Sequence, residues 1–303
     1  MPRLIVKGPR EEVEKIGRII GCITTIRAWV VETPTIPRKV PEGIIAYPDI
    51  DVHLVESIVS RVRSAVLTFK DVREAMNIEE LWERGGTGEG IRVGIVDSGC
   101  QSNGVKNIKD GKSFVDNNPF KDEVSHGTWV ASAINSETKR AGKGLAPDSE
   151  LIIAKAFSSN KTKLSTFMMA LDWVYTTGVD VINLSLGTEY HHPLFHEMIS
   201  KITEQVPVVV AAGNTGPKPA SVLFPAAYRE AIAVGSVRLP EMTPSVFSAR
   251  GPGYQGVIKP DIVAPGGDKG QGILGLAPPP LTVKVMSGTS MAAPFVTATI
   301  ADF

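Results

Sequence analysis

The chain has 303 residues, 43% of them hydrophobic, which is enough for one large core and a small second domain. Lysine and arginine together number 32, as do aspartate and glutamate, so the net charge gives no reason to expect nucleic acid or an anionic membrane as a partner. No apolar run is long enough to cross a bilayer, and two cysteines are too few for a disulfide framework. The N-terminus lacks the apolar stretch of a secretory signal, so we expect a monomer that is either cytoplasmic or secreted and shown without its signal.

The first 55 residues predict a small α+β unit. Residues 4–7 have the composition of a strand, and residues 11–20 have that of a helix stopping at Gly21. A second strand is expected over 23–31 and a short third one over 44–47. We expect this unit to occupy residues 1–55, followed by a linker over 56–71.

The main domain is expected over residues 72–303, starting with a helix over 72–84. Short runs rich in valine and isoleucine then recur between helix-like segments, at 91–96, 151–157, 179–184, 206–212 and 231–237. They are apolar on both faces, which is typical of strands buried between helix layers in a parallel sheet. Ser165 is expected to cap one intervening helix, and Pro193 to open another. The alternation predicts an α/β three-layer sandwich with a mostly parallel central sheet.

Four short motifs fall at predicted strand ends or helix starts of this domain. They are VDSG at 96–99, HGT at 126–128, AAGN at 211–214 and GTSMAAP at 288–294. The first three are weak singly, since each is common as a turn or a helix cap. The last is specific, because packing does not explain a serine between threonine and methionine in a glycine-led loop before a helix of small residues.

Taken together and in this order, the motifs resemble those of the subtilisin-like serine protease (subtilase) family, in which the triad also runs Asp, His, Ser. Further matches are VINLSLG at 181–187, FPAAY at 224–228 and KPDIVAPG at 259–266. The resemblance covers about residues 72–303. It implies a subtilisin-like fold and a serine endopeptidase that forms an acyl-enzyme intermediate.

The chemistry of this reaction gives each motif a role. The hydroxyl of Ser290 is a poor nucleophile until a base takes its proton, and the imidazole of His126 titrates in the right range to do so. Asp97 would hold the imidazole in the correct tautomer. Asn214 would donate its side-chain amide to the developing oxyanion, beside the backbone N–H of Ser290.

The resemblance also implies a cleft with two extended edges, between which a polypeptide substrate adds as a strand. The primary specificity pocket would have one wall formed by the AAG segment and a leucine near its base, which favours modest apolar side chains. The residues expected to bind substrate are Ser158, Ser185, Leu186, Gly187, Ala211, Ala212, Gly213 and Leu223.

The N-terminal unit, with PEGIIAYPD at 41–49, resembles the inhibitory prodomain that precedes many subtilases; the alternative is an independent binding domain. A prodomain would assist folding and then hold its tail in the cleft until cleaved. The resemblance places the processing site in the linker, between about His53 and Lys70. The chain would thus be a self-processing precursor whose partners are polypeptide substrates and its own prodomain.

No cofactor is required for this chemistry, although the family often binds structural calcium. The loop over 135–144, where one such site often lies, carries three basic residues and one glutamate, whereas calcium prefers carboxylates and carbonyls, so no site is assigned. The cluster His191, His192 and His196 lacks a carboxylate at a recognised metal-site spacing, so we interpret it as a solvated helix start.

Three departures from the family pattern remain. Trp129 and Ser132 stand where the family more often has histidine and glycine, and we expect both to concern packing. The chain ends at Phe303, 13 residues after Ser290, so the catalytic domain is expected to be truncated. Two alternatives to a peptidase stay open: a catalytically silent homologue that binds peptides, and a subtilase-type peptide transferase, for which no shielding insertion is long enough.

Overall fold

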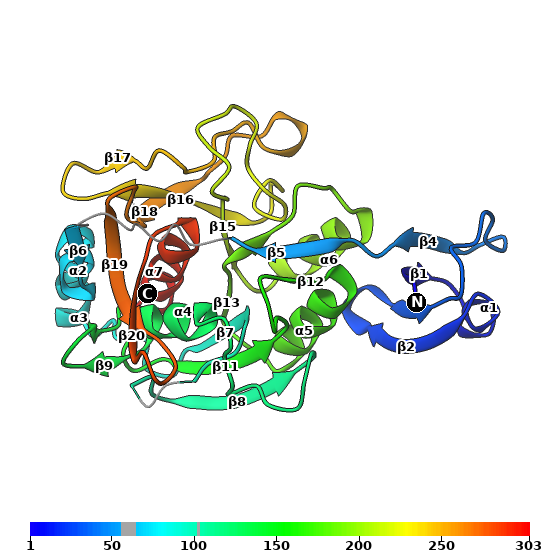
Figure 1. Ribbon diagram of the computed structural model, residues 1–303, viewed down its shortest axis with the longest axis horizontal. Helices are drawn as coiled ribbons and strands as arrows, with labels where there is room; N and C mark the ends of the chain where they lie inside the picture. The colour runs from blue at the N-terminus through cyan, green and yellow to red at the C-terminus, as the bar shows by residue number, and fades with distance from the viewer. Residues whose placement is uncertain (56–64, 102–103) are drawn as a thin grey trace.

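The computed structural model describes residues 1–55, 65–101 and 104–303 (Figure 1). Its main domain is built on an eight-stranded sheet with the order β17-β16-β15-β13-β7-β11-β8, and β18 pairs with β16 beside that path. The central strands run parallel, as predicted. The bounds are β7 (Arg92–Asp97), β8 (Ile108–Ser113), β11 (Glu150–Lys155), β13 (Val181–Leu184), β15 (Val208–Ala211), β16 (Ile232–Arg238), β17 (Thr243–Pro244) and β18 (Ile262–Pro265).

Both faces of this sheet are buried, because neighbouring residues of one strand join different core clusters. Ile152 packs into a cluster with residues of α5 (Leu164–Thr176) and α6 (Pro193–Thr203). Ile153 packs into a second cluster with residues of α4 (His126–Ile134) and α7 (Thr289–Ala301). The expected α/β three-layer sandwich is therefore confirmed.

The N-terminal unit has its own antiparallel sheet, of order β2-β3-β1-β4. Its elements are β1 (Arg3–Lys7), α1 (Arg10–Glu14), β2 (Arg18–Ile23), η1 (Thr24–Ile26), β3 (Ala28–Glu32) and β4 (Ile45–Pro48). The predicted helix over 11–20 was too long, because its second half pairs with β3 as a strand. Its β-branched pair Ile19-Ile20 favours that state, and a side chain at Gly17 would lie 2.2 Å from the carbonyl of Glu32.

The segment after this unit leaves the small sheet and enters the main domain. There β5 (Asp51–Leu54) lies between β12 (Lys161–Lys163) and β14 (Leu186–Gly187), antiparallel to both. Figure 1 shows β5 extending from the N-terminal unit into the main domain. Residues 51–55, called the tail here, thus complete a three-stranded sheet on the surface of the main domain.

Of the expected linker over 56–71, residues 56–64 lie outside the described ranges. Its last part already belongs to the main domain: β6 (Ala65–Leu67) pairs with β19 (Gln271–Leu276), which also pairs with β20 (Val283–Met286). The predicted helix over 72–84 is two helices, α2 (Phe69–Met76) and α3 (Ile78–Glu83), because Asn77 adopts a left-handed conformation with φ 55°.

The remaining short elements are the hairpin of β9 (Glu137–Thr138) and β10 (Gly142–Lys143), and the 3-10 turn η2 (Tyr254–Gly256). Among the helices of the described ranges, none combines the length and the apolar character required to cross a membrane.

Candidate active site

Asp97 and His126 meet at one edge of the central sheet. Asp97 ends β7, and His126 is the first residue of α4. Both are buried, at 0% and 3% exposure, and Nδ1 of His126 lies 2.8 Å and 3.0 Å from the two carboxylate oxygens of Asp97. This contact fixes the ring, and leaves its Nε2 buried with no hydrogen-bond partner among the described residues.

The start of α4 is fixed by a carboxylate that the sequence motifs did not single out. Asp122 accepts hydrogen bonds from the backbone N–H of Thr128 at 2.9 Å and of Ser125 at 2.8 Å, and from the hydroxyl of Ser98 at 2.8 Å. The Ser98 hydroxyl in turn accepts the N–H of Gly127. Burial raises the pKa of Asp122, and the nearby charge of Asp97 raises it further. Asp122 therefore caps α4 and links it to the residue after Asp97.

The loop that carries Asp122 is anchored by a buried lysine. Lys155, at the end of β11 and 0% exposed, places its Nζ 2.5 Å from Asp116 and 2.7 Å from Glu123. The hydrogen bond from Lys155 holds the pKa of Glu123 at about 2. Because the ammonium is paired with two carboxylates, its burial is compensated and the loop is held against the sheet.

Ser290 is the second residue of α7, where backbone N–H groups have no partner within the helix. The preceding residue ties this helix start to the loop after β15. The Thr289 N–H donates to Oδ1 of Asn214 at 2.9 Å, and the Thr289 hydroxyl accepts the N–H of Gly213 at 3.0 Å. A side chain at Gly288 would lie 2.8 Å from Nδ2 of Asn214, and the φ of 154° at Gly288 is one that residues with a side chain rarely adopt. The structure thus brings Asn214 beside the start of the helix that carries Ser290.

The tail runs directly over Ser290. The N–H of Leu54 donates to the carbonyl of Asn160 at 2.9 Å, and that of Val55 to the carbonyl of Ser185 at 3.4 Å. The Ser290 hydroxyl donates to the carbonyl of Val55 at 3.0 Å. A backbone carbonyl of this chain therefore lies at the hydroxyl that the motifs mark as the nucleophile.

The residues predicted to bind substrate lie around the tail, with one difference. Leu186 and Gly187 pair with Leu54 and His53, as an edge strand of a cleft would. The opposite edge is β12, which follows Ser158; that serine lies exposed in the preceding bend, outside the register that pairs residues 161–163 with 51–53. The sequence KTK of β12 is short and polar and has no apolar alternation, so β12 could not be predicted from hydrophobic periodicity.

A groove of about 740 Å³ lies beside the tail and is lined by Val55, Gly187, Asn214 and Leu223, among others. The predicted wall is close by: Ala211 and Ala212 are fully buried at the end of β15, and the Ala212 carbonyl accepts the N–H of Leu223. A side chain at Gly213 would lie 2.7 Å from Cγ of Leu223, and one at Gly187 would lie 2.8 Å from its Cβ. Leu223 therefore fills space between these two glycines and limits the depth of the groove.

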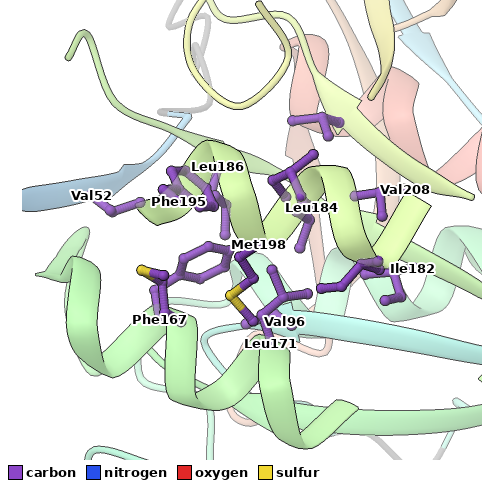
Figure 2. Close-up of a cluster of buried hydrophobic side chains, with 14 of the residues drawn as sticks. Val52, Val96, Phe167, Leu171, Ile182, Leu184, Leu186, Phe195, Met198 and Val208 are labelled. Atoms are coloured by element: carbon purple, nitrogen blue, oxygen red, sulfur yellow. The ribbon is translucent and has the colours of Figure 1, made fainter. Parts of the chain in front are cut away.

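Val52, the most deeply buried residue of the tail, enters the core of the main domain. It is 0% exposed and belongs to the cluster that includes Leu186, Phe167 and Phe195, which Figure 2 shows together. The rings of Phe167 and Phe195 meet edge to face, with centroids 5.5 Å apart. The pocket for this position is thus apolar.

Two carboxylates join the N-terminal unit to α5. Asp49 accepts the N–H of Ser165 at 2.9 Å and its hydroxyl at 2.6 Å, while Asp172 accepts the backbone N–H groups of Thr24 at 3.0 Å and Thr25 at 2.7 Å. The prediction that Ser165 caps its own helix was wrong, since α5 begins at Leu164 and the carboxylate of Asp49 caps it. Each part of the chain therefore satisfies a helix start of the other.

The interpretation of the histidine cluster as a solvated helix start was also wrong. His191 stacks on Tyr254 with centroids 4.5 Å apart, and His192 is 4% exposed beneath Tyr47 of the N-terminal unit. Burial lowers the pKa of His192 to about 4, and the neighbouring His191 adds to the effect. No group of three or more potential metal ligands occurs within residues 1–55, 65–101 and 104–303.

The loop over 135–144 does not fit a calcium ion. It forms the hairpin of β9 and β10, and its only acid, Glu137, is paired with Lys106. Oδ1 of Asn135 is buried without a partner among the described residues, but calcium takes six to eight oxygen ligands. The hairpin is instead held by its own backbone pairs.

Trp129 and Ser132 take part in packing, as expected. Trp129 is fully buried between Phe69 and Phe295, and its Nε1 donates to the carbonyl of Ile273. The Ser132 hydroxyl accepts the N–H of Leu276. Both residues join the helix that begins at His126 to β19.

A parallel sheet with Asp97, His126 and the start of the helix that carries Ser290 at one edge is typical of one class of serine peptidases. A sequence profile of the subtilase family matches residues 88–302, and the chain belongs to that family. The resemblance found in the sequence is thereby confirmed.

Curated relatives support the same conclusion. The membrane-bound transcription factor site-1 protease of Rattus norvegicus is 32% identical over 243 residues, covering 76% of this chain and 22% of that protein. Subtilisin Savinase of Lederbergia lenta is 35% identical over 217 residues, covering 70% of this chain and 76% of its own length. The alkaline protease of Alkalihalobacillus alcalophilus has the same identity over the same length, with 53% of it covered. The chain spans about a fifth of the length of the site-1 proteases.

Proposed function

We propose that the protein is a serine endopeptidase made as a self-processing precursor, in which residues 1–55 are an inhibitory prodomain. The observation that carries this proposal is the tail, which pairs as a strand with both cleft edges and sets the Val55 carbonyl 3.0 Å from the Ser290 hydroxyl. A peptide held in this way is positioned as a substrate, and its scissile bond would join Val55 to Glu56.

In the first step His126 takes the proton of Ser290 through Nε2 as the Ser290 oxygen attacks the carbonyl carbon of Val55. Asp97 holds the ring by Nδ1 and stabilises the imidazolium. The negative charge on the carbonyl oxygen is met by Nδ2 of Asn214 and the backbone N–H of Ser290. His126 then protonates the departing amine, and water, activated by the same base, releases Val55 from the acyl-enzyme.

The tail also indicates what the cleft accepts. Val55 occupies the position before the scissile bond, and Leu223 limits the groove beside it, which suits a modest apolar side chain. Leu54 and Val52 are buried at the second and fourth positions. Peptides that differ only in the residue before the scissile bond would test this, and a clear preference for Lys, Arg or Tyr would contradict it.

Reciprocal capping supports the prodomain assignment. Asp49 and Asp172 each complete a helix start across the interface, so the N-terminal unit assists formation of α5 as well as covering the cleft. An independent binding domain would not need to place its last strand between β12 and β14.

The proposal is tested by labelling the chain with a fluorophosphonate probe, after limited proteolysis to release the N-terminal unit. The probe reacts only with a serine activated by its base and oxyanion site. Labelling that is lost in Ser290→Ala supports the peptidase. Absence of labelling in the unaltered chain would favour a silent homologue that binds peptides. If the chain is labelled, incubation with a peptide and an added amine separates the remaining alternatives: hydrolysis products support the peptidase, and a peptide coupled to the amine would favour a transferase.

A further inference from the structure

Two side chains of the tail, those of Asp51 and His53, point outward and do not enter the apolar core of the main domain. Along β5, Val52 and Leu54 are buried, whereas His53 is exposed and Asp51 is half-buried. Successive strand residues point to opposite faces, so Asp51 and His53 share the face directed away from the core. They occupy the fifth and third positions before the bond that follows Val55.

A lysine of β12 lies opposite each of these positions. The register pairs Lys161 with His53 and Lys163 with Asp51. Side chains directly opposite on antiparallel strands share one face, with Cβ atoms about 4.5–5.5 Å apart. Nζ of Lys163 is 2.8 Å from Oδ1 of Asp51, and this hydrogen bond lowers the pKa of Asp51, helped by the charge of Lys161.

The edge of the cleft opposite β12 is formed by β14. Gly187 of β14 pairs with His53 and brings no side chain to that position. Glu189 lines the same groove as Asp51 and His53 and carries a negative charge. At the position of His53, β14 therefore contributes no side chain that could oppose the charge of Lys161.

We propose that Lys161 and Lys163 are specificity-determining residues that favour acidic side chains at the third and fifth positions before the scissile bond. The inference rests on the proposed peptidase function and on Val55 as the residue before that bond. It defines the substrate class as peptide segments with carboxylates at these two positions and apolar residues at the fourth, second and first. The tail supplies only one of the two carboxylates, so a substrate with both competes well with it for the cleft.

The first test needs no catalysis and uses the full chain carrying Ser290→Ala. Amide hydrogen exchange of the segment 51–55 is measured at pH 8. Exposed ion pairs are worth up to about 1 kcal/mol, so His53→Glu should slow exchange about two- to fivefold and His53→Lys should speed it similarly. Adding Lys161→Glu should reverse that order, whereas Lys70→Glu, an equal charge change on α2, should preserve it.

The second test uses the chain with Ser290 intact, after self-processing, and two peptides that differ only by Glu or Lys at the third position. We expect kcat/KM to favour Glu by several-fold, and Lys161→Glu to invert the preference. Reversed exchange without cleavage of any peptide would support the charge preference and contradict the peptidase. Cleavage without any charge preference, together with exchange that Lys161→Glu does not reverse, would overturn the inference.

Discussion

Asp172 offers the sharpest test of how the N-terminal unit is held. Its carboxylate accepts four hydrogen bonds, from the backbone N–H and the hydroxyl of both Thr24 and Thr25, at 2.6–3.0 Å. Asp172 is 7% exposed, whereas Thr24 lies at the surface, where water can reach it. Replacing Asp172 by alanine removes both acceptor oxygens, and with them all four hydrogen bonds, without touching the tail or the cleft.

The magnitude follows from these contacts. A hydrogen bond to a charged group contributes about 1.5–3 kcal/mol, but the four bonds share one carboxylate and water partly replaces them. We therefore expect Asp172→Ala to weaken docking by about 2–4 kcal/mol, or roughly 30- to 800-fold in the opening equilibrium.

The assay is amide hydrogen exchange in the full chain carrying Ser290→Ala, which cannot process itself. Exchange of Thr24 and Thr25, and of tail residues Leu54 and Val55, should rise by this factor. Asp180→Asn is the control, because its carboxylate accepts the N–H of Arg92 within the main domain. Exchange that stays within twofold of the parent chain in Asp172→Ala would refute the reasoning.

Three further predictions concern catalysis, stability and pH dependence. Asn214→Ala should lower kcat about a hundredfold or more with KM little changed, measured on an apolar peptide substrate. Asp122→Ala should lower the melting temperature, since it removes the cap of α4 at a cost of about 1–2 kcal/mol, and Asp122→Asn should restore part of that loss. Burial lowers the pKa of His192 to about 4, so the docked state holds this imidazole neutral. Acidification from pH 7 to 4 favours the protonated imidazole of the undocked state and should therefore loosen the N-terminal unit. Exchange protection of β1–β4 should therefore fall more in the parent chain than in His192→Gln, while the opposite contribution of Asp49, whose pKa burial raises, is common to both.

The parts of the structure that local sequence determines were predictable. The five buried strands follow from apolar runs of the right length, and the motifs that contain Asp97 and Asn214 lie where two of these strands end. The left-handed Asn77 was not predictable, because helix signals continue on both sides of it. The end of α1 at Glu14 was not predicted either, since pairing of Ile19 with β3 outweighs the local helix preference of the residues that follow.

Contacts between distant segments account for the rest. Asp49 and Ser165 are 116 residues apart, and nothing near either residue marks their pairing. The lysines of β12 stand in a polar stretch that resembles a loop until the tail pairs with it. The position of Val55 at Ser290 likewise depends on a strand inserted from another part of the chain.

The most direct test of the account is the intact mass of the purified full chain followed over time. We predict that it divides into a fragment that ends at Val55 and one that begins at Glu56, and that Ser290→Ala stays whole under the same conditions. Cleavage at the same bond in Ser290→Ala, or an unaltered chain that is cut elsewhere and never after Val55, would contradict the assignment of Ser290 as nucleophile and Val55 as its first substrate residue.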